Sequence, residues 1–482
     1  MVTYNIGWVI YFVASKLVFK KHQIEIGICL KPGQRDGNTP MKVGIIGAGA
    51  AGLTAGYELA KSGHSVEIFE EAPFIGGQAS TFEVGKGRLE RGYHHLFMSD
   101  EDMITLINEL GLSEELSWIE STVGLFHAGR IWDFSSPFDL LKFTPLPLIQ
   151  RLKVGIWSLL LQKTSSWEKY EHITAKHWIT SHMGQDAYRI IWEPLLRGKF
   201  GHYHDQISMT WLWGKFRLRV ASRQSILSKE KLGYPMCSFG SVFDKLGDRI
   251  RLLSGQIHLG TRVQEITISN DQAVGLKIQR SPNEVANLSF NAVIATTPSY
   301  IFTKLVPSLP EAYKEQLHNT QYLAAVVLIL ELNHPLSSKY WLNIADLDLP
   351  FVGVIEHTNL VDPQLYSGTH LVYLTNYPDT DSEIYNMTKE QLLDTYIPHL
   401  KKLNPDFHPS WIHRSHHHKI NGAQPVVGID YARNIPSHRT PFQNLYLANT
   451  TQIYPEDRGT NYSVRMGRFV SKLLQEDFNT TD

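Results

Sequence analysis

Three glycines at positions 47, 49 and 52 have the spacing of a turn that holds the phosphates of a dinucleotide. In such a turn, the first glycine permits a tight bend and the second lets the pyrophosphate approach the backbone. The third lets the following helix pack closely on a strand. The start of that helix presents free N–H groups, which bind phosphate oxygens. We therefore expect a phosphate-binding turn made of Gly47, Gly49, Ala50, Ala51 and Gly52.

The elements that position this turn form a complete βαβ unit. Residues 43–46 are a short β-branched run typical of a buried strand, and residues 53–63 continue as a helix that ends at a glycine. Residues 66–69 read as the next strand, and Glu70 closes it, where a carboxylate can accept hydrogen bonds from ribose hydroxyls. Glu71, the next residue, should point away from the nucleotide. This unit alone does not distinguish NAD from FAD.

Two further motifs indicate a flavin. The run EEAPFIGGQ places a glycine pair, Gly76 and Gly77, shortly after the acid, and ERGYHH places Gly92 two residues before His94. Both resemble flavoproteins of the amine oxidase superfamily, in which a second glycine loop lies against the diphosphate and a Gly-x-His loop reaches the flavin ring. The superfamily has a basic residue after the pair, whereas this chain has Gln78, which we still expect at the cofactor.

The resemblance extends over most of residues 41–478. Within the superfamily, the chain most resembles members of the protoporphyrinogen oxidase and phytoene desaturase types. It implies that the backbone of Val263 meets the adenine and that residues 457–462 close the flavin site. From about Asn461 the chain reads as a helix, whose first N–H groups would stabilise charge on a reduced flavin. Gly459 should turn without needing a Cβ, and Gly467 reads as ordinary helix interior. The expected cofactor residues here are Val263, Asp457, Gly459, Thr460, Asn461 and Tyr462.

The order of these motifs predicts an α/β fold with a discontinuous Rossmann-like FAD-binding domain and an inserted α+β substrate domain. We assign the segments 41–99, 232–298 and 413–477 to the FAD-binding domain. We assign 100–231, which reads as largely helical, and 299–412 to the substrate domain. Residues 1–40 are interpreted as an extension outside the fold, either an over-long start before Met41 or a short membrane-surface anchor.

Composition narrows the class of partner and the compartment. The 482-residue chain has a formal net charge of -1, which gives no general attraction to nucleic acid. Its two cysteines, Cys29 and Cys237, are too few for a disulfide framework or a metal cluster, and we expect a cytoplasmic protein. Covalent flavoproteins of this superfamily use a cysteine near the C-terminal motif. Cys237 is far from it in sequence, so we expect non-covalent FAD. Residues 416–418 are three histidines in a row, a poor ligand set, and we read them as a solvated strand end rather than a metal site.

Two segments leave alternatives open. Residues 138–161 are unusually apolar with interspersed basic residues, which fits a core helix or a peripheral membrane patch at an inner membrane face that admits a lipophilic substrate. Residues 192–201 read as a turn between helices, in which Arg197 and Lys199 either meet an anionic substrate or remain solvated. Tyr431 and Tyr454 could line the flavin face by analogy alone.

The leading functional hypothesis is an FAD-dependent oxidoreductase that moves a hydride from a bulky, lipophilic small molecule to flavin N5. No general base is compulsory for an electron-rich donor, and no catalytic residue can be named. A UDP-galactopyranose mutase-like isomerase is an alternative, because arginines that could clamp a diphosphate are present at positions 189, 197, 217 and 219. A non-catalytic flavin-binding protein is the third hypothesis.

Overall fold

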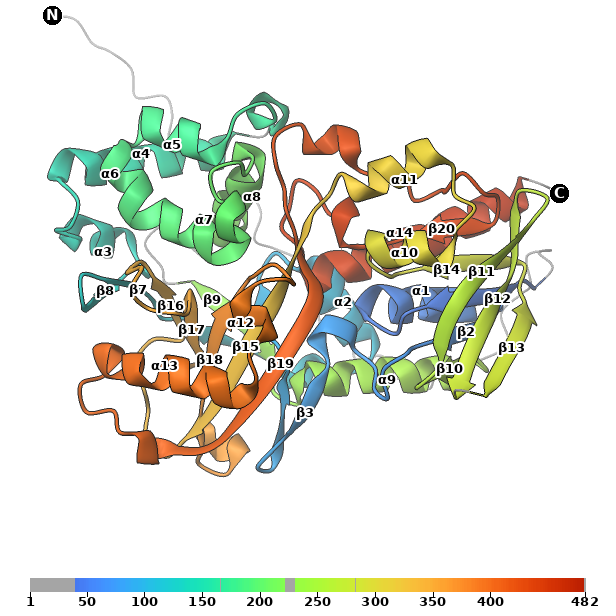
Figure 1. The fold of residues 1–482 in the computed structure, drawn as a ribbon, viewed down its shortest axis with the longest axis horizontal. Helices are drawn as coiled ribbons and strands as arrows, with labels where there is room; N and C mark the ends of the chain where they lie inside the picture. The colour runs from blue at the N-terminus through green and yellow to red at the C-terminus, as the bar shows by residue number, and fades with distance from the viewer. Residues whose placement is uncertain (1–39, 165, 222–229, 282, 481–482) are drawn as a thin grey trace, which may run out of the picture. The chain divides into compact units, whose positions relative to one another are not determined.

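The computed structural model describes residues 40–164, 166–221, 230–281 and 283–480, with the backbone alone for 219–221 (Figure 1). The extension expected at residues 1–40 therefore lies outside the described residues, apart from Pro40. Met41 is the first buried residue among those described: its side chain is 3% exposed and packs into the main hydrophobic core.

A five-stranded parallel sheet forms the nucleotide-binding part. Its central strand is nearly fully buried, and Ile45 pairs with Ile68 on one side and with Ile294 on the other. Continuous apolar runs of this kind are typical of a parallel sheet covered on both faces. In spatial order the strands are β10 (Gln256–His258), β2 (Ser65–Phe69), β1 (Lys42–Ile46), β14 (Ala292–Ala295) and β20 (Leu445–Leu447).

Helix α1 (Ala50–Lys61) follows β1 and packs against both α9 (Ser238–Leu252) and α14 (Thr460–Asn479). Figure 1 shows α1 between segments that are far apart in the sequence. The contact with α14 is close, because a Cβ on Gly467 would lie 2.5 Å from the carbonyl oxygen of Ala51. Gly467 lies in the interior of α14, as predicted, but the prediction did not include the close approach of α1 to this position. A helical periodicity does not reveal where two backbones meet.

Three small antiparallel sheets surround this core. They comprise β3 (Thr81–Val84) with β4 (Gly87–Glu90); β5 (Leu96–Phe97), β9 (Lys231–Pro235) and β6 (Leu116–Glu120); and β11 (Arg262–Ser269), β12 (Gln272–Ser281) and β13 (Glu284–Ser289). Helix α2 (Glu101–Glu109) follows β5, and α10 (Ser299–Leu305) and α11 (Glu311–His318) follow β14. Asp100 precedes α2 but does not cap it, since its carboxylate accepts a hydrogen bond from the N–H of Phe97 at 2.9 Å.

A seven-stranded sheet forms the wall of the second part of the molecule. Along β15 (Tyr322–Leu332) the side chains of Ala325, Val327 and Ile329 enter one core, whereas Val326, Leu328 and Leu330 enter another. This alternation follows from the two-residue period of a strand, and α13 (Lys389–Leu403) covers the second face. The strand order is β19 (Ile412–Pro425), β15 (Tyr322–Leu332), β18 (His370–Asn376), β17 (Gly353–Glu356), β16 (Trp341–Ile344), β7 (Val123–His127) and β8 (Arg130–Asp133).

The part of the chain between β8 and β9 forms helices that lie beside the β16, β7 and β8 end of this sheet (Figure 1). They are α3 (Pro137–Lys142), α4 (Leu148–Lys163), α5 (Ala175–His182), α6 (Gln185–Ala187), α7 (Glu193–Phe200) and α8 (Met209–Ala221), with α12 (Glu383–Asn386) later in the chain. A π-helix, Tyr188–Trp192, leads directly into α7. Residues 192–201 are thus mainly helical, not the turn that we expected.

The fold class is α/β, as predicted. Strand β19 falls in a segment that we assigned to the FAD-binding domain, yet it pairs with β15 of the second insert. Strands β7 and β8 of the first insert extend the same sheet, and both inserts were assigned to the substrate domain. The domain division itself stays a prediction. The histidines at 416–418 lie inside β19 and not at a solvated strand end. His416 Nε2 lies 2.6 Å from the Glu331 carboxylate, and burial lowers the pKa of His418 to about 4.

Candidate functional site

The two glycine loops lie against each other at the carboxyl end of the parallel sheet. Gly47 has φ of +102°, a conformation that favours glycine, and a Cβ on Gly52 would lie 2.0 Å from the Gly47 carbonyl oxygen. Gly49 forms a bridge with Gly76, and a Cβ on Gly77 would lie 3.0 Å from the Gly49 Cα. Ala50 and Ala51 begin α1 beside this contact. The backbone is thus bare at the place where a diphosphate would need it.

Glu70 lies at the end of β2, beside this turn. Its carboxylate accepts hydrogen bonds from the backbone N–H groups of Ala48, at 2.8 Å, and Ala72, at 2.9 Å. The segment that leads to β11 runs alongside, because the N–H of Thr261 donates to the Glu70 carbonyl at 2.8 Å, and this brings Val263 close. Glu71 instead has a side chain that is 71% exposed, 3.8 Å from Arg262. The two acids therefore differ in environment as the strand register predicts.

Gln78, Gly92 and His94 line the cavity described below. Gln78 donates through Nε2 to the Gly422 carbonyl at 3.1 Å. Burial lowers the pKa of His94 to about 4, so its ring is neutral at physiological pH, and Nδ1 lies 2.7 Å from the Gly92 carbonyl. The neighbouring Tyr93 reaches Tyr377, with 2.8 Å between their hydroxyl oxygens.

The start of α14 faces the same cavity. Thr460 and Asn461 are buried, and the N–H groups of residues 460–462 have no recorded acceptor in the described part of the chain. The Asn461 side chain accepts from the N–H of Met103 at 3.0 Å, whereas its buried Nδ2 has no partner there. Gly459 has φ of -176°, so its backbone is extended and does not require glycine, contrary to our expectation. Bare glycine loops, free N–H groups and an unpaired amide fit a flavin nucleotide.

Side chains from α7 and α8 hold the Asp457 carboxylate. Its carboxylate lies 2.6 Å from Lys199 Nζ and 2.5 Å from Lys215 Nζ, and it accepts a hydrogen bond from Trp211 Nε1 at 3.1 Å. Burial alone would raise the pKa of Asp457, but the positive charges of Lys199, Lys215 and Arg458 hold it well below its usual range. Arg458 makes its own hydrogen bonds to Gln424, at 2.9 Å, and to the Tyr377 hydroxyl, at 3.3 Å.

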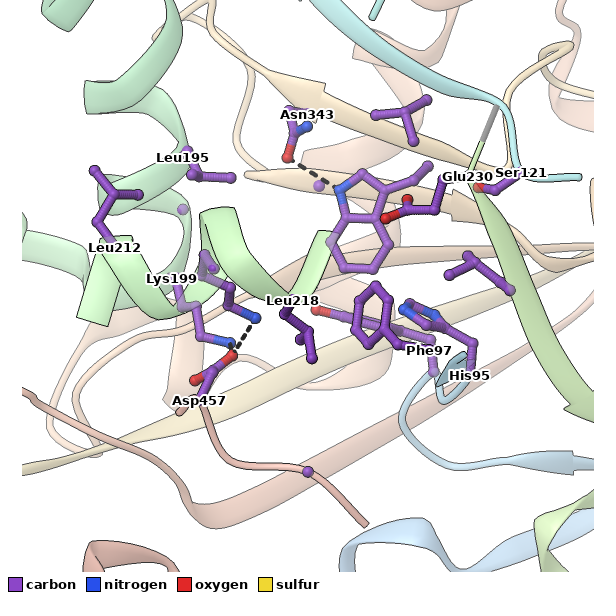
Figure 2. A pocket seen from close by; sticks show the side chains of 18 of the residues that line it. His95, Phe97, Ser121, Leu195, Lys199, Leu212, Leu218, Glu230, Asn343 and Asp457 are labelled. Carbon is purple, nitrogen blue, oxygen red and sulfur yellow. Dashed lines mark hydrogen bonds and ion pairs between the residues drawn. The ribbon is translucent and has the colours of Figure 1, made fainter. Parts of the chain in front are cut away.

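These groups open into a cavity of about 500 Å³. Figure 2 shows Lys199 and Asp457 on one side of it, Glu230 and Ser121 on the other, and Leu218 between them, with Leu195 on the side of Lys199. Predicted cofactor residues 78, 92, 94 and 457–462 all line it, whereas the glycine turn, Glu70 and Val263 do not. One connected space therefore joins the C-terminal flavin motif to the helices over the seven-stranded sheet.

Helix α4 separates this cavity from the surface. Only Val154 and Leu161 of its side chains are buried, so the segment is not a core helix. Val154, Gly155 and Leu159 line the cavity. Large apolar side chains are exposed along α3 and α4, and we call them the α3–α4 apolar surface: Phe138, Leu141, Leu148, Ile149, Leu152, Ile156, Leu159 and Leu160.

Several other residues singled out in the sequence lie away from the cavity lining. Arg197 pairs with Glu193, and Arg189 pairs with Asp186 on the surface. Arg217 lies over Trp213, and none of these three arginines lines the cavity; the Arg219 side chain lies outside the described residues. Tyr431 and Tyr454 pack on each other, and Tyr454 contacts Glu171 away from the cavity lining.

Sequence reasoning missed Lys215 and Trp211. They are four residues apart on α8 and so share one face, and a lysine on the buried face of an apolar helix is the signal that could have indicated them.

Among the described residues, no helix has both the length and the apolar character needed to cross a membrane.

The model of the flavin-containing amine oxidoreductase family matches residues 50–455. A chloroplastic 15-cis-phytoene desaturase from an Oncidium hybrid cultivar is 22% identical over 91% of this chain and 78% of that protein. A mitochondrial protoporphyrinogen oxidase from Nicotiana tabacum is 26% identical over 55% of this chain and 60% of that protein. The crystal structure of a reduced UDP-galactopyranose mutase, 14% identical, superimposes with a TM-score of 0.69 over 90% of this chain and 96% of that one, which shows a shared fold alone. Because the family model covers most of the chain and the glycine loops fit its cofactor, this chain belongs to the flavin-containing amine oxidoreductases and is an FAD-dependent oxidoreductase.

Proposed function

We propose that this oxidoreductase acts on a bulky, lipophilic substrate that occupies the cavity between the C-terminal flavin motif and α4. When bound, FAD supplies the chemistry by accepting a hydride at flavin N5. The observation that carries the proposal is the shared wall: α4 lines the cavity with Val154 and Gly155 and exposes apolar side chains on its other side. The relatives include a phytoene desaturase and a protoporphyrinogen oxidase, both named for bulky substrates, which supports a bulky substrate here.

The chain's own part is to bind and orient. The two glycine loops, Ala50 and Ala51 would hold the diphosphate, Glu70 the ribose and Val263 the adenine. Gln78, Gly92, His94 and residues 457–462 would hold the flavin end. We assign no general base.

We further propose that the FAD is bound without a covalent bond. Cys237 lies at the start of α9, outside the cavity lining, and Cys29 lies outside the described residues. Burial also raises the pKa of the Cys237 thiol, which leaves less of the nucleophilic thiolate.

The α3–α4 apolar surface favours peripheral contact with a membrane from which such a substrate would enter. Exposed apolar patches rimmed by polar residues mark interaction sites, and basic residues such as Arg151 and Lys153 on α4 suit anionic lipid. Exchange of Leu152 and Ile156 for Asp should weaken cosedimentation with phosphatidylglycerol vesicles at least about tenfold, given roughly 1.5–3 kcal/mol for each fully buried side chain. Leu347, which is 77% exposed elsewhere, is the matched control for Asp substitution. Equal losses from the control and the double variant would remove the patch from the proposal.

The mutase alternative is less well supported. It needs arginines that clamp a diphosphate, and Arg189, Arg197 and Arg217 are engaged away from the cavity. Conversion of UDP-galactopyranose by the dithionite-reduced protein, with no oxidation of apolar substrates, would reverse this preference.

The decisive experiment is anaerobic titration of the holoprotein with phytoene, protoporphyrinogen and smaller polar amines, with loss of the flavin's visible absorption as the readout. We expect bleaching by a lipophilic donor and not by the amines. A Cβ on Gly155 would meet only Leu140, at 3.9 Å, so Gly155→Phe should fill the cavity and slow bleaching while FAD stays bound, with Gly155→Ala as its control. Equal bleaching rates in the two variants would show that the substrate does not use this cavity.

A further inference from the structure

A buried acid precedes the loop that carries Gly92 and His94. Glu90 ends β4, and residues 92–95, which we call the flavin loop, all line the cavity. The Glu90 side chain is 0% exposed and does not line the cavity itself. Any influence of this acid on a bound flavin must therefore pass through the residues that it contacts.

The Glu90 carboxylate holds two segments beside the flavin loop. Its Oε1 accepts a hydrogen bond from the backbone N–H of Phe239, the second residue of α9, at 3.0 Å. The hydroxyl of Tyr234, on β9, lies 3.1 Å from Oε1 and 2.9 Å from Oε2. The Phe239 ring packs in turn against the His94 ring, with 5.7 Å between the two centroids. The carboxylate thus fixes a residue that contacts His94.

The backbone carbonyl of Glu90 holds a second residue that packs on the loop. It accepts a hydrogen bond from the hydroxyl of Tyr373, on β18, at 2.8 Å. The Tyr373 ring meets the Tyr93 ring edge to face, with 6.1 Å between the centroids. The Tyr93 hydroxyl reaches that of Tyr377, which also accepts a hydrogen bond from Arg458 of the C-terminal flavin motif. Glu90 therefore lies where the flavin loop, α9 and the seven-stranded sheet meet.

An acid is costly at this position. Burial raises the pKa of Glu90 to about 7, because its ionised form has lost contact with water. A leucine would fill similar space without this cost, but it would leave the Phe239 N–H and the Tyr234 hydroxyl without the acceptor that they have here. The side chain thus supplies a fixed placement of these two groups, which an apolar residue could not.

We propose that Glu90 is a positioning residue, which holds Tyr93 and His94 of the flavin loop in the orientation that a bound flavin requires. The proposal rests on the place proposed above for the flavin, beside Gly92 and His94, and does not depend on the identity of the substrate. Glu90 acts through Phe239 and Tyr373, and it takes no part in hydride transfer.

The test measures two signals in variants of the holoprotein: the dissociation constant of FAD and the visible circular dichroism of the bound flavin, which reports on the groups around the ring. Glu90→Leu should weaken FAD binding about tenfold, the order expected for one lost hydrogen bond to a charged group, and should change the dichroism. Glu90→Gln keeps an acceptor oxygen for Phe239 and Tyr234 and should restore most of both signals.

Glu356→Leu is the matched control. Glu356 is also a fully buried acid whose pKa is raised to about 7 by burial, but its carboxylate accepts from the N–H groups of Leu336 and Ser337, and it does not line the cavity. This variant should lose thermal stability and keep both flavin signals.

Thermal destabilisation of Glu90→Leu with unchanged flavin signals would overturn the proposal, as would equal changes of these signals in Glu356→Leu. A Glu90→Gln protein as impaired as Glu90→Leu would show that charge is required rather than hydrogen bonding, and would overturn it too. If His94→Ala changed neither signal, the flavin loop would not reach the flavin, and the proposed flavin site would be wrong together with the role of Glu90. If Glu90→Leu does not fold, Tyr373→Phe provides the same comparison, because it removes the hydrogen bond to the Glu90 carbonyl and keeps the ring against Tyr93.

Discussion

The close packing of α14 on α1 predicts how a substitution at Gly467, which does not line the cavity, changes the stability of the protein. Gly467→Ala should destabilise the protein, because the new Cβ would lie 2.5 Å from the Ala51 carbonyl oxygen and 2.9 Å from Thr54 Cβ. The first contact is with backbone, which cannot rotate away, so α14 must move. Overpacking of this kind costs about 1–3 kcal/mol. The better helix propensity of alanine returns about 1 kcal/mol. We expect a net loss of up to about 2 kcal/mol.

Two matched glycines calibrate this loss. Gly155→Ala on α4 meets only Leu140 at 3.9 Å, so it should gain about 0.5–1 kcal/mol from helix propensity. Gly459→Ala meets only Tyr462 at 3.7 Å from an extended backbone and should leave the stability of the apoprotein unchanged within about 0.5 kcal/mol.

Urea unfolding of the three apoproteins, followed by circular dichroism, measures these differences. The Gly467 variant should also lose FAD more readily, since α1 begins at the glycine turn. A Gly467→Ala protein as stable as the Gly155→Ala protein would refute the close approach of the two helices.

Three further predictions concern the cofactor and pH. Glu70→Ala should weaken FAD retention by about ten- to a hundredfold, since hydrogen bonds to a charged group are worth roughly 1.5–3 kcal/mol, and Glu71→Ala should change it little; equal losses in FAD titrations would mean that the strand register is misread. Acid denaturation should release free FAD, because Cys237 does not line the cavity. Flavin that stays attached to the denatured chain would exclude non-covalent binding. Burial raises the pKa of Glu90 from 4.5 to about 7, so the folded state binds the extra proton and stability falls as pH rises between these values, by on the order of 3 kcal/mol. Glu90→Gln keeps one acceptor oxygen, which at the Oε1 position can accept from both the Phe239 N–H and the Tyr234 hydroxyl, and it should flatten this dependence in unfolding curves at pH 5 and pH 8; an unchanged pH slope would contradict it.

The sequence by itself determined the nucleotide-binding unit and the family. The spacing of Gly47, Gly49 and Gly52 between two apolar runs is a local pattern, because strand, turn and helix are contiguous and each residue type serves its neighbours. The different environments of Glu70 and Glu71 follow from strand alternation alone. The apolar character of residues 138–161 was also visible, but a hydrophobic run reads the same on a core helix and on a surface helix. Only the packed fold shows that α4 exposes one side and lines the cavity with the other.

Tertiary structure alone decided the chemistry of the substrate side. Lys199, Lys215 and Asp457 lie on three segments separated by up to 258 residues, and no periodicity relates α7, α8 and the approach to α14. In the sequence Arg197 and Lys199 were equivalent candidates, but two residues along an α-helix turn the side chains by about 200°. Arg197 therefore pairs with Glu193, whereas Lys199 lines the cavity. Likewise, Gly459 looked like the demanding glycine and Gly467 the ordinary one, and the opposite holds. Backbone conformation and the approach of a distant helix set the requirement for glycine, and both arise only when the chain is folded.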